Sequence, residues 1–151
     1  MGATPKTSPI KIRGARLEDS AKLAELSGQL GYPSTEEQIR RRLQSLLHFP
    51  GQAAFVACAS DDLPAGFVSL QILRTLEADA RVEVTALVVG EEYRSRGVGK
   101  VLMGCAEDWA RAQGCTMIGL RSNVIRERAH SFYQRLGYEH LKSQKAFRKA
   151  L

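Results

Sequence analysis

The sequence predicts an α/β protein built on one mixed β-sheet with helices on both faces. Strand-like apolar runs and amphipathic helical periods alternate along the chain, and the longest strand-like run leads into a glycine-containing loop that opens a helix. This order is typical of proteins in which helices connect the strands of a common sheet. With 151 residues, 44% of them hydrophobic and 25% charged, the chain has the size and composition of a globular domain.

Two regions are expected: a disordered lead-in over residues 1–9 and a single domain over residues 10–151. The lead-in contains proline, threonine and serine and lacks the apolar stretch of a signal peptide. No apolar run approaches the ~18 residues that a membrane-spanning helix requires. We therefore expect a soluble protein with no membrane partner.

In the first half of the chain, the pattern predicts one strand, two helices and two further strands. The first strand covers Lys11–Ala15, and Asp19 is expected to cap the helix that follows. Ser34–Glu37 has the composition of a capping box and predicts the start of a second helix, which ends near His48. A turn then separates two strands, over Ala53–Ala59 and Ala65–Leu73.

In the second half, the pattern predicts strand, helix, strand, helix and a last strand. Arg81–Val89 is the longest strand, and apolar residues at helical spacing continue from it through residues 99–114. Cys115–Leu120 reads as a short buried strand. The next helix should stop at Gly137, because glycine is favoured just after a helix ends, and the tail is expected to return as a strand through Phe147.

The strongest functional signal is the loop between Val89 and Lys100, with the core Arg94-x-x-Gly97-x-Gly99. At a helix N-terminus, unpaired N–H groups and the positive end of the helix dipole point at the same place, which favours an anion. The glycines let a phosphate approach the backbone, and two arginines add charge. This predicts a phosphorylated cofactor, with a ligand-free turn as the alternative. The candidate residues are Arg94, Ser95, Arg96, Gly97, Val98, Gly99 and Lys100.

The spacing excludes two common phosphate loops. A Walker A loop needs glycine where Arg94 stands and serine or threonine where Val101 stands. A dinucleotide-binding fingerprint needs glycine or alanine at the position of Leu102.

The remaining pattern resembles the acyl-CoA pyrophosphate loop of the GNAT superfamily of N-acyltransferases, Arg/Gln-x-x-Gly-x-Gly/Ala. A later stretch is similar to the other signature of this family, Asn-x-x-Ala-x-x-Phe-Tyr-x-x-x-Gly-Phe/Tyr. It departs from that signature at Arg126, where the family usually has asparagine, and Asn123 is a candidate for the same polar role. The matching residues are Ala129, Phe132, Tyr133, Gly137 and Tyr138.

The resemblance implies that Arg81–Val89 and Cys115–Arg121 run parallel and splay apart. In such a gap the pantetheine arm of acetyl-CoA, the co-substrate, pairs with exposed strand backbone. The implied activity is transfer of the acetyl group to a primary amine by direct attack in a ternary complex. Besides the loop, the implied cofactor contacts are Leu87, Val88, Val89, Asn123 and Ala129.

Glu83 is the candidate general base. An alkyl ammonium with a pKa of about 10.4 must lose a proton before it attacks a thioester. Strict alternation along the strand puts Glu83 on one face with Thr85 and Leu87. The alternative is a strand-end charge paired with Arg74 or Arg81.

Tyr133 is the implied donor to the leaving thiolate. Phenol and thiol pKa values of about 10 and 8.5 make such a transfer nearly balanced. The alternative places Phe132 and Tyr133 as core aromatics under Leu136. The resemblance further implies a main-chain N–H near Val89 as the oxyanion donor, which no side chain marks.

The acceptor is predicted only as a small-molecule or peptide amine. The resemblance places its pocket at the first two helices, their link and the segment near Arg74–Arg81. Tyr32, Glu77 and Asp79 are the candidate substrate-binding residues, and each could equally be a turn residue. An aminoglycoside would call for a strongly acidic cleft, which these few carboxylates hardly supply. The family often forms homodimers through late strands.

A net charge of +6 and a pI near 9.5 raise the alternative of a nucleic-acid-binding module. The densest basic cluster, Arg40 to Arg42, spreads over a solvent-facing helix side, and no zinc ligands accompany it. A non-catalytic acyl-CoA-binding regulator is the other alternative. Cys58, Cys105 and Cys115 lack metal-ligand spacing, so no metal is expected, and free thiols point to the reducing cytoplasm.

Overall fold

The computed structural model describes residues 9–122 and 127–151, which form two compact units that divide between Leu120 and Arg121. The predicted lead-in up to residue 8 and the predicted cofactor contact Asn123 lie outside the described residues. Within the described residues, the first unit contains a five-stranded sheet with three α-helices, and the second contains one α-helix. None of the described helices has the length and apolar character needed to cross a lipid bilayer.

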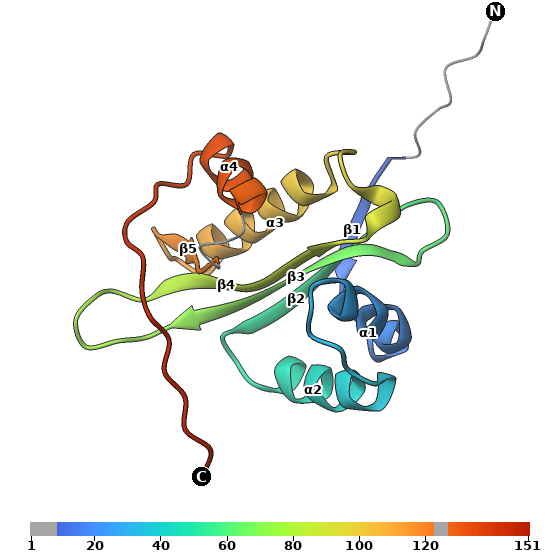
Figure 1. The fold of residues 1–151 in the computed structure, drawn as a ribbon, viewed down its shortest axis with the longest axis horizontal. Coiled ribbons are helices and arrows are strands. Elements are labelled where there is room, and N and C mark those ends of the chain that lie inside the picture. The colour runs from blue at the N-terminus through green and yellow to red at the C-terminus, as the bar shows by residue number, and fades with distance from the viewer. Residues whose placement is uncertain (1–8, 123–126) are drawn as a thin grey trace, which may run out of the picture. The chain divides into compact units, whose positions relative to one another are not determined.

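The sheet of the first unit has the strand order β1-β2-β3-β4-β5 (Figure 1). Its first four strands are antiparallel neighbours, and β4 pairs with β5 in parallel, so the sheet is mixed as predicted. The strands are β1 Lys11–Gly14, β2 Gln52–Cys58, β3 Pro64–Leu73, β4 Arg81–Val89 and β5 Ile118–Leu120.

Helices cover both faces of this sheet, which confirms the predicted class (Figure 1). On one face, Leu26 and Leu43 pack with Val56 and Val88 in a buried cluster. On the other face, the buried stripe of α3 includes Leu102 and Met103, both fully buried. The helices are α1 Ser20–Gln29, α2 Glu36–His48 and α3 Val98–Ala112, with short 3-10 turns η1 Leu17–Asp19 and η2 Glu91–Tyr93.

Two predicted helix starts differ in their details. The Thr35 hydroxyl accepts from the N–H of Gln38 (3.1 Å) and the Gln38 side chain accepts from the N–H of Thr35 (3.0 Å), so the capping box of α2 begins at Thr35. Asp19 gives α1 no side-chain cap. Its buried carboxylate instead accepts two bonds of 2.8 Å from the Arg13 guanidinium and one of 2.8 Å from the N–H of Arg16. A buried charge is costly unless it is paired and hydrogen-bonded, so the Asp19 carboxylate binds Arg13 and the N–H of Arg16 instead of capping α1.

A β-bulge interrupts the pairing of β3 with β4. Ser69 lies opposite Ala86 and Leu70 lies opposite Val84, so Thr85 is an extra residue on β4. The extra residue reverses the alternation of side chains beyond it. Leu87 therefore lies on the face opposite Glu83, and the prediction that both share a face is wrong.

The second unit contains α4, Glu127–Arg135, and Gly137 follows shortly after its end, as predicted. Gly137 has a φ of 93°, and the N–H of Tyr138 donates to the carbonyl of Tyr133 over 3.0 Å. Residues 139–151 are exposed and carry no strand, so the predicted last strand through Phe147 is wrong. A strand forms only where a neighbouring strand pairs with it and where one of its faces is buried. The local sequence pattern determines neither condition.

Candidate functional site

The loop from Gly90 into α3 is shaped to present backbone N–H groups. Ser95 and Gly97 have φ values of 65° and 79°, and Gly97 is the residue before the helix. Val98, only 3% exposed, anchors the first turn in the core. No residue that the structure describes accepts a hydrogen bond from the N–H groups of Arg94–Lys100. These unpaired donors stand at the positive end of a 15-residue helix, which is an anion-binding arrangement.

Three positive side chains belong to the same segment as these donors. Arg94, Arg96 and Lys100 are exposed, and within the described ranges none of them forms a salt bridge. The Arg96 guanidinium carbon lies 5.7 Å from the centroid of the Tyr93 ring, a cation–π contact that orients it. The loop therefore combines unpaired N–H groups with cationic side chains that form no salt bridge among the described residues, an arrangement that suits a polyphosphate.

Two neighbouring elements hold the base of this loop. The side-chain oxygen of Gln29, the last residue of α1, accepts from the N–H of Glu91 over 3.0 Å. The N–H of Gly90 donates to the carbonyl of Ala65 on β3 over 2.8 Å. A Cβ on Gly90 would lie 3.1 Å from that carbonyl and 3.2 Å from Leu26, so glycine permits the close approach. Gln29 lies 62 residues from its partner, and no local pattern indicated this role.

The end of β4 presents an open backbone edge on the β5 side. β5 pairs with β4 only from Val82 to Val84, so within the described first unit no strand continues beside Leu87 and Val89. Antiparallel strands direct the polar groups of successive residues to opposite edges. Because Gly90 donates to β3, Val88 also faces β3, and Leu87 and Val89 face the open edge. β4 thus extends past the end of its pairing with β5; of the three residues predicted to contact the cofactor through their backbone, Leu87 and Val89 face the open edge and Val88 faces β3.

Glu83 lies on the sheet face that α1 and α2 cover farther along. It pairs with Gln71, which shares its face of β3 with Phe67, and Phe67 packs against the core cluster under those helices. Glu83 itself is half-buried, so it borders this cover. Tyr32, in the link between the same two helices, is 68% exposed.

The remaining predicted residues are spread over both units. Glu77 and Asp79 are exposed in the loop between β3 and β4. In the second unit, Ala129 and Tyr133 both lie on α4. The half-buried Tyr133 ring makes edge contacts with Phe132 (5.2 Å between centroids) and Tyr138 (6.1 Å).

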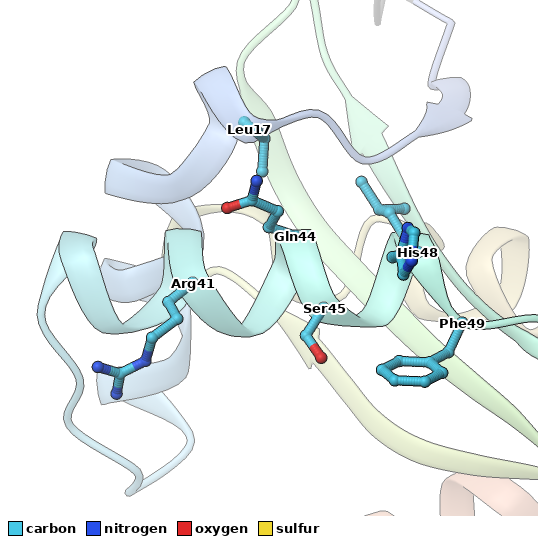
Figure 2. Close-up of a pocket in the computed structure, with 7 residues that line it drawn as sticks. Leu17, Arg41, Gln44, Ser45, His48 and Phe49 are labelled. Atoms are coloured by element: carbon cyan, nitrogen blue, oxygen red, sulfur yellow. The ribbon is translucent and has the colours of Figure 1, made fainter.

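A shallow hollow of about 570 Å³ lies along α2 and contains none of the predicted site residues (Figure 2). Nearby, Arg40 donates to the carbonyl of Leu17 (3.4 Å) and Arg42 to the hydroxyl of Ser34 (2.9 Å). The basic cluster on α2 is therefore partly used within the fold. The hollow is lined by Leu17, Arg41, Gln44, Ser45, Leu47, His48 and Phe49.

Comparison with known proteins gives a consistent result. The model of the acetyltransferase (GNAT) family matches residues 21–138, which includes both motifs. Aminoglycoside N(6')-acetyltransferase type 1 of Klebsiella aerogenes is 28% identical over 152 residues, covering 96% of this chain and 99% of that protein. An uncharacterized N-acetyltransferase of Methanocaldococcus jannaschii is 30% identical over 87 residues, 56% of this chain, and the chain spans only 38% of that protein.

The fold recurs in a solved aminoglycoside N-acetyltransferase in complex with CoA. That structure superposes with a TM-score of 0.84 at 22% identity, covering 99% of this chain and 100% of the other. The mixed sheet, the phosphate-type loop and the match over most of the sequence agree. The chain belongs to the acetyltransferase (GNAT) family.

Proposed function

We propose that the chain is an N-acetyltransferase that moves the acetyl group of acetyl-CoA to a primary amine by direct attack in a ternary complex. One observation carries the proposal: the open β4 edge at Leu87 and Val89 runs directly into the unpaired N–H groups of Arg94–Lys100. A ligand with an amide-containing arm and a pyrophosphate end suits these two features in turn. The relatives named as N-acetyltransferases support it.

Each part of the site has a proposed task. The loop and Lys100 hold the pyrophosphate, and the N–H of Val89 stabilises the oxyanion that forms on the acetyl carbonyl. Glu83 takes a proton from the acceptor ammonium, through water where needed, so that the amine can attack. The amine attacks the acetyl carbon to form the tetrahedral intermediate, whose collapse breaks the C–S bond. The nitrogen loses its second proton as the amide forms, the departing thiolate takes up a proton, and the Tyr133 hydroxyl donates a hydrogen bond to that thiolate. Ala129 and Asn123 remain proposed cofactor contacts.

The acceptor is proposed to be a small polar amine, with Tyr32, Glu77 and Asp79 at its pocket. Two similar proteins are named for such substrates, an aminoglycoside acetyltransferase of Klebsiella aerogenes and an aminoalkylphosphonate acetyltransferase of Salmonella typhimurium. A peptide amine and a homodimeric state stay predictions, as does the single domain of residues 10–151.

A cytoplasmic location is proposed because the three cysteines are free thiols in the described structure. Burial raises the pKa of Cys58 and of Cys105, which keeps both protonated and unreactive. Free structural thiols are typical of proteins in a reducing compartment.

The test is a panel of primary amines assayed for acetyl-CoA-dependent release of free CoA thiol. We expect release with at least one amine, and a lower rate in Glu83→Gln that partly recovers at alkaline pH. Recovery is expected because more of the amine is then deprotonated without help from the enzyme.

Three outcomes would contradict parts of this proposal. Thermal stabilisation by acetyl-CoA without thiol release from any amine would favour the non-catalytic regulator. A loss in Glu83→Gln that stays constant with pH would remove Glu83 from the role of base. Salt-sensitive binding of nucleic acid, without a response to acetyl-CoA, would favour the basic module.

A further inference from the structure

Two hydroxyl groups meet at the β4 bulge, on the sheet face that α1 and α2 cover farther along. The Oγ of Ser69 lies 2.6 Å from the Oγ1 of Thr85, a short hydrogen bond between neighbouring strands. Ser69 is half-buried and Thr85 is exposed, so the pair is open to solvent on this unit. It lies next to the candidate base Glu83 along β4.

The bulge accounts for this arrangement. Ser69 shares a face of β3 with Gln71, and Gln71 lies opposite Glu83. Because Thr85 contacts Ser69, the hydroxyl pair and Glu83 point to the same side of the sheet. Thr85 is the residue without a cross-strand position, which leaves its side chain beside that of Ser69 instead of in a regular pair.

The pair has hydrogen-bonding capacity to spare. One hydroxyl donates to the other, which leaves one O–H donor and lone pairs on both oxygens. Residues two apart on a strand lie roughly 6–7 Å from each other, so Glu83 and the pair can contact two groups of one small molecule. An ammonium suits the carboxylate, and a hydroxyl two or three bonds away suits the pair, which can both donate and accept.

We propose that Ser69 and Thr85 form an acceptor-binding subsite that selects amines bearing a neighbouring hydroxyl group. This inference rests on the proposed acetyltransferase function and narrows its substrate class to amino alcohols. The substrate hydroxyl exchanges hydrogen bonds with the pair while the amine lies at Glu83.

The test compares ethanolamine with ethylamine, which differ by one hydroxyl. The hydroxyl also lowers the pKa of the amine, so the preference is taken as the ratio of the two kcat/KM values and compared between proteins. In Thr85→Val, which keeps the branched shape, the preference for ethanolamine should fall by roughly 2- to 13-fold from the wild-type value, the effect of one net hydrogen bond. Thr85→Ser keeps the hydroxyl and should retain the preference, and Ser69→Ala should reduce it independently.

A second readout separates the possible failures. Stabilisation of the CoA complex by each amine, followed as a melting temperature, should show the same preference and the same loss in Thr85→Val. A preference that survives in both hydroxyl-deleting variants, or equal losses with both amines, overturns the subsite. A wild-type protein that acetylates no amine overturns the proposed function, and the binding readout then decides the subsite.

Discussion

Charged side chains cluster in two regions of the first unit, and the two clusters differ in burial and in salt-bridge pairing. At the start of the chain, Arg13 donates to both oxygens of Asp19 at 2.8 Å and to Asp62 at 3.0 Å. The Arg13 and Asp19 side chains are only 13% and 6% exposed. In the loop before α3, Arg94 and Arg96 are exposed, and no carboxylate among the described residues pairs with them.

This difference distinguishes charged side chains that stabilise the fold from charged side chains that are available to a ligand. A buried and fully paired charge stabilises the fold only while its partners remain, because an uncompensated buried charge is costly. Exposed charges beside unpaired N–H groups add little to the fold and remain available to a ligand. Substitutions at the Arg13 cluster should therefore change stability, and substitutions at the loop should change binding.

The largest effect is expected from Asp19→Asn. It leaves the half-buried Arg13 with a weaker partner. The free energy of unfolding should fall by about 3 kcal/mol, the low end for breaking a buried pair, since Asp62 remains as a partner. Urea denaturation measures it. The matched control is Asp62→Asn, since Asp62 has a φ of 58°, which asparagine also adopts, and is exposed. If Asp62→Asn destabilises the protein as much as Asp19→Asn, burial does not decide which carboxylate matters for stability.

The same cluster predicts sensitivity to acid. Burial by itself would raise the pKa of Asp19, but hydrogen bonds from Arg13 and from the N–H of Arg16 outweigh it and hold the pKa below its usual range. The stabilisation is thus present above the unfolded pKa of about 3.9 and is lost as pH falls toward the lower folded value. As pH falls from about 5 through the unfolded value, Asp19→Asn should lose less stability than the wild-type protein.

The next effect is expected from Gly99→Asp in the loop. It adds bulk and negative charge at the anion site and should abolish the stabilisation by acetyl-CoA, which is about 2.7 kcal/mol at 100 times the dissociation constant. Gly104→Asp is the control, since Gly104 lies on the same helix, is exposed and has no atom within 4 Å of an added Cβ. A shift that survives Gly99→Asp would place the phosphate elsewhere.

The smallest effect is expected at Gln29, which links α1 to the loop. Gln29→Leu removes the acceptor for the N–H of Glu91 and should weaken acetyl-CoA binding by roughly 2- to 13-fold, the range of one net hydrogen bond. Gln29→Glu keeps an oxygen at that position and should lose less. Calorimetric titration measures both, and equal losses would show that the hydrogen bond does not support the loop.

Local sequence determined much of this protein. The bounds of β4 and the stop of α4 at Gly137 follow from residues near each position in the chain. The Arg94-x-x-Gly97-x-Gly99 pattern also identified the loop, because glycine freedom, helix start and charge are all local properties. Family and fold followed from these patterns and were confirmed.

Tertiary structure alone decided the features that join distant residues. Thr85 is the extra residue of a β-bulge, and Leu87 lies on the face opposite to the predicted one. The reason is the register in which β3 pairs with β4, which strict alternation along β4 does not reveal. Asp19 is a buried partner of Arg13 instead of a helix cap. The side chain of Gln29 accepts a hydrogen bond from the N–H of Glu91, 62 residues away in the chain. The pattern of residues within one segment indicates the secondary structure that this segment favours. A hydrogen bond between two distant segments forms only after folding has brought them together, so neither segment alone predicts it.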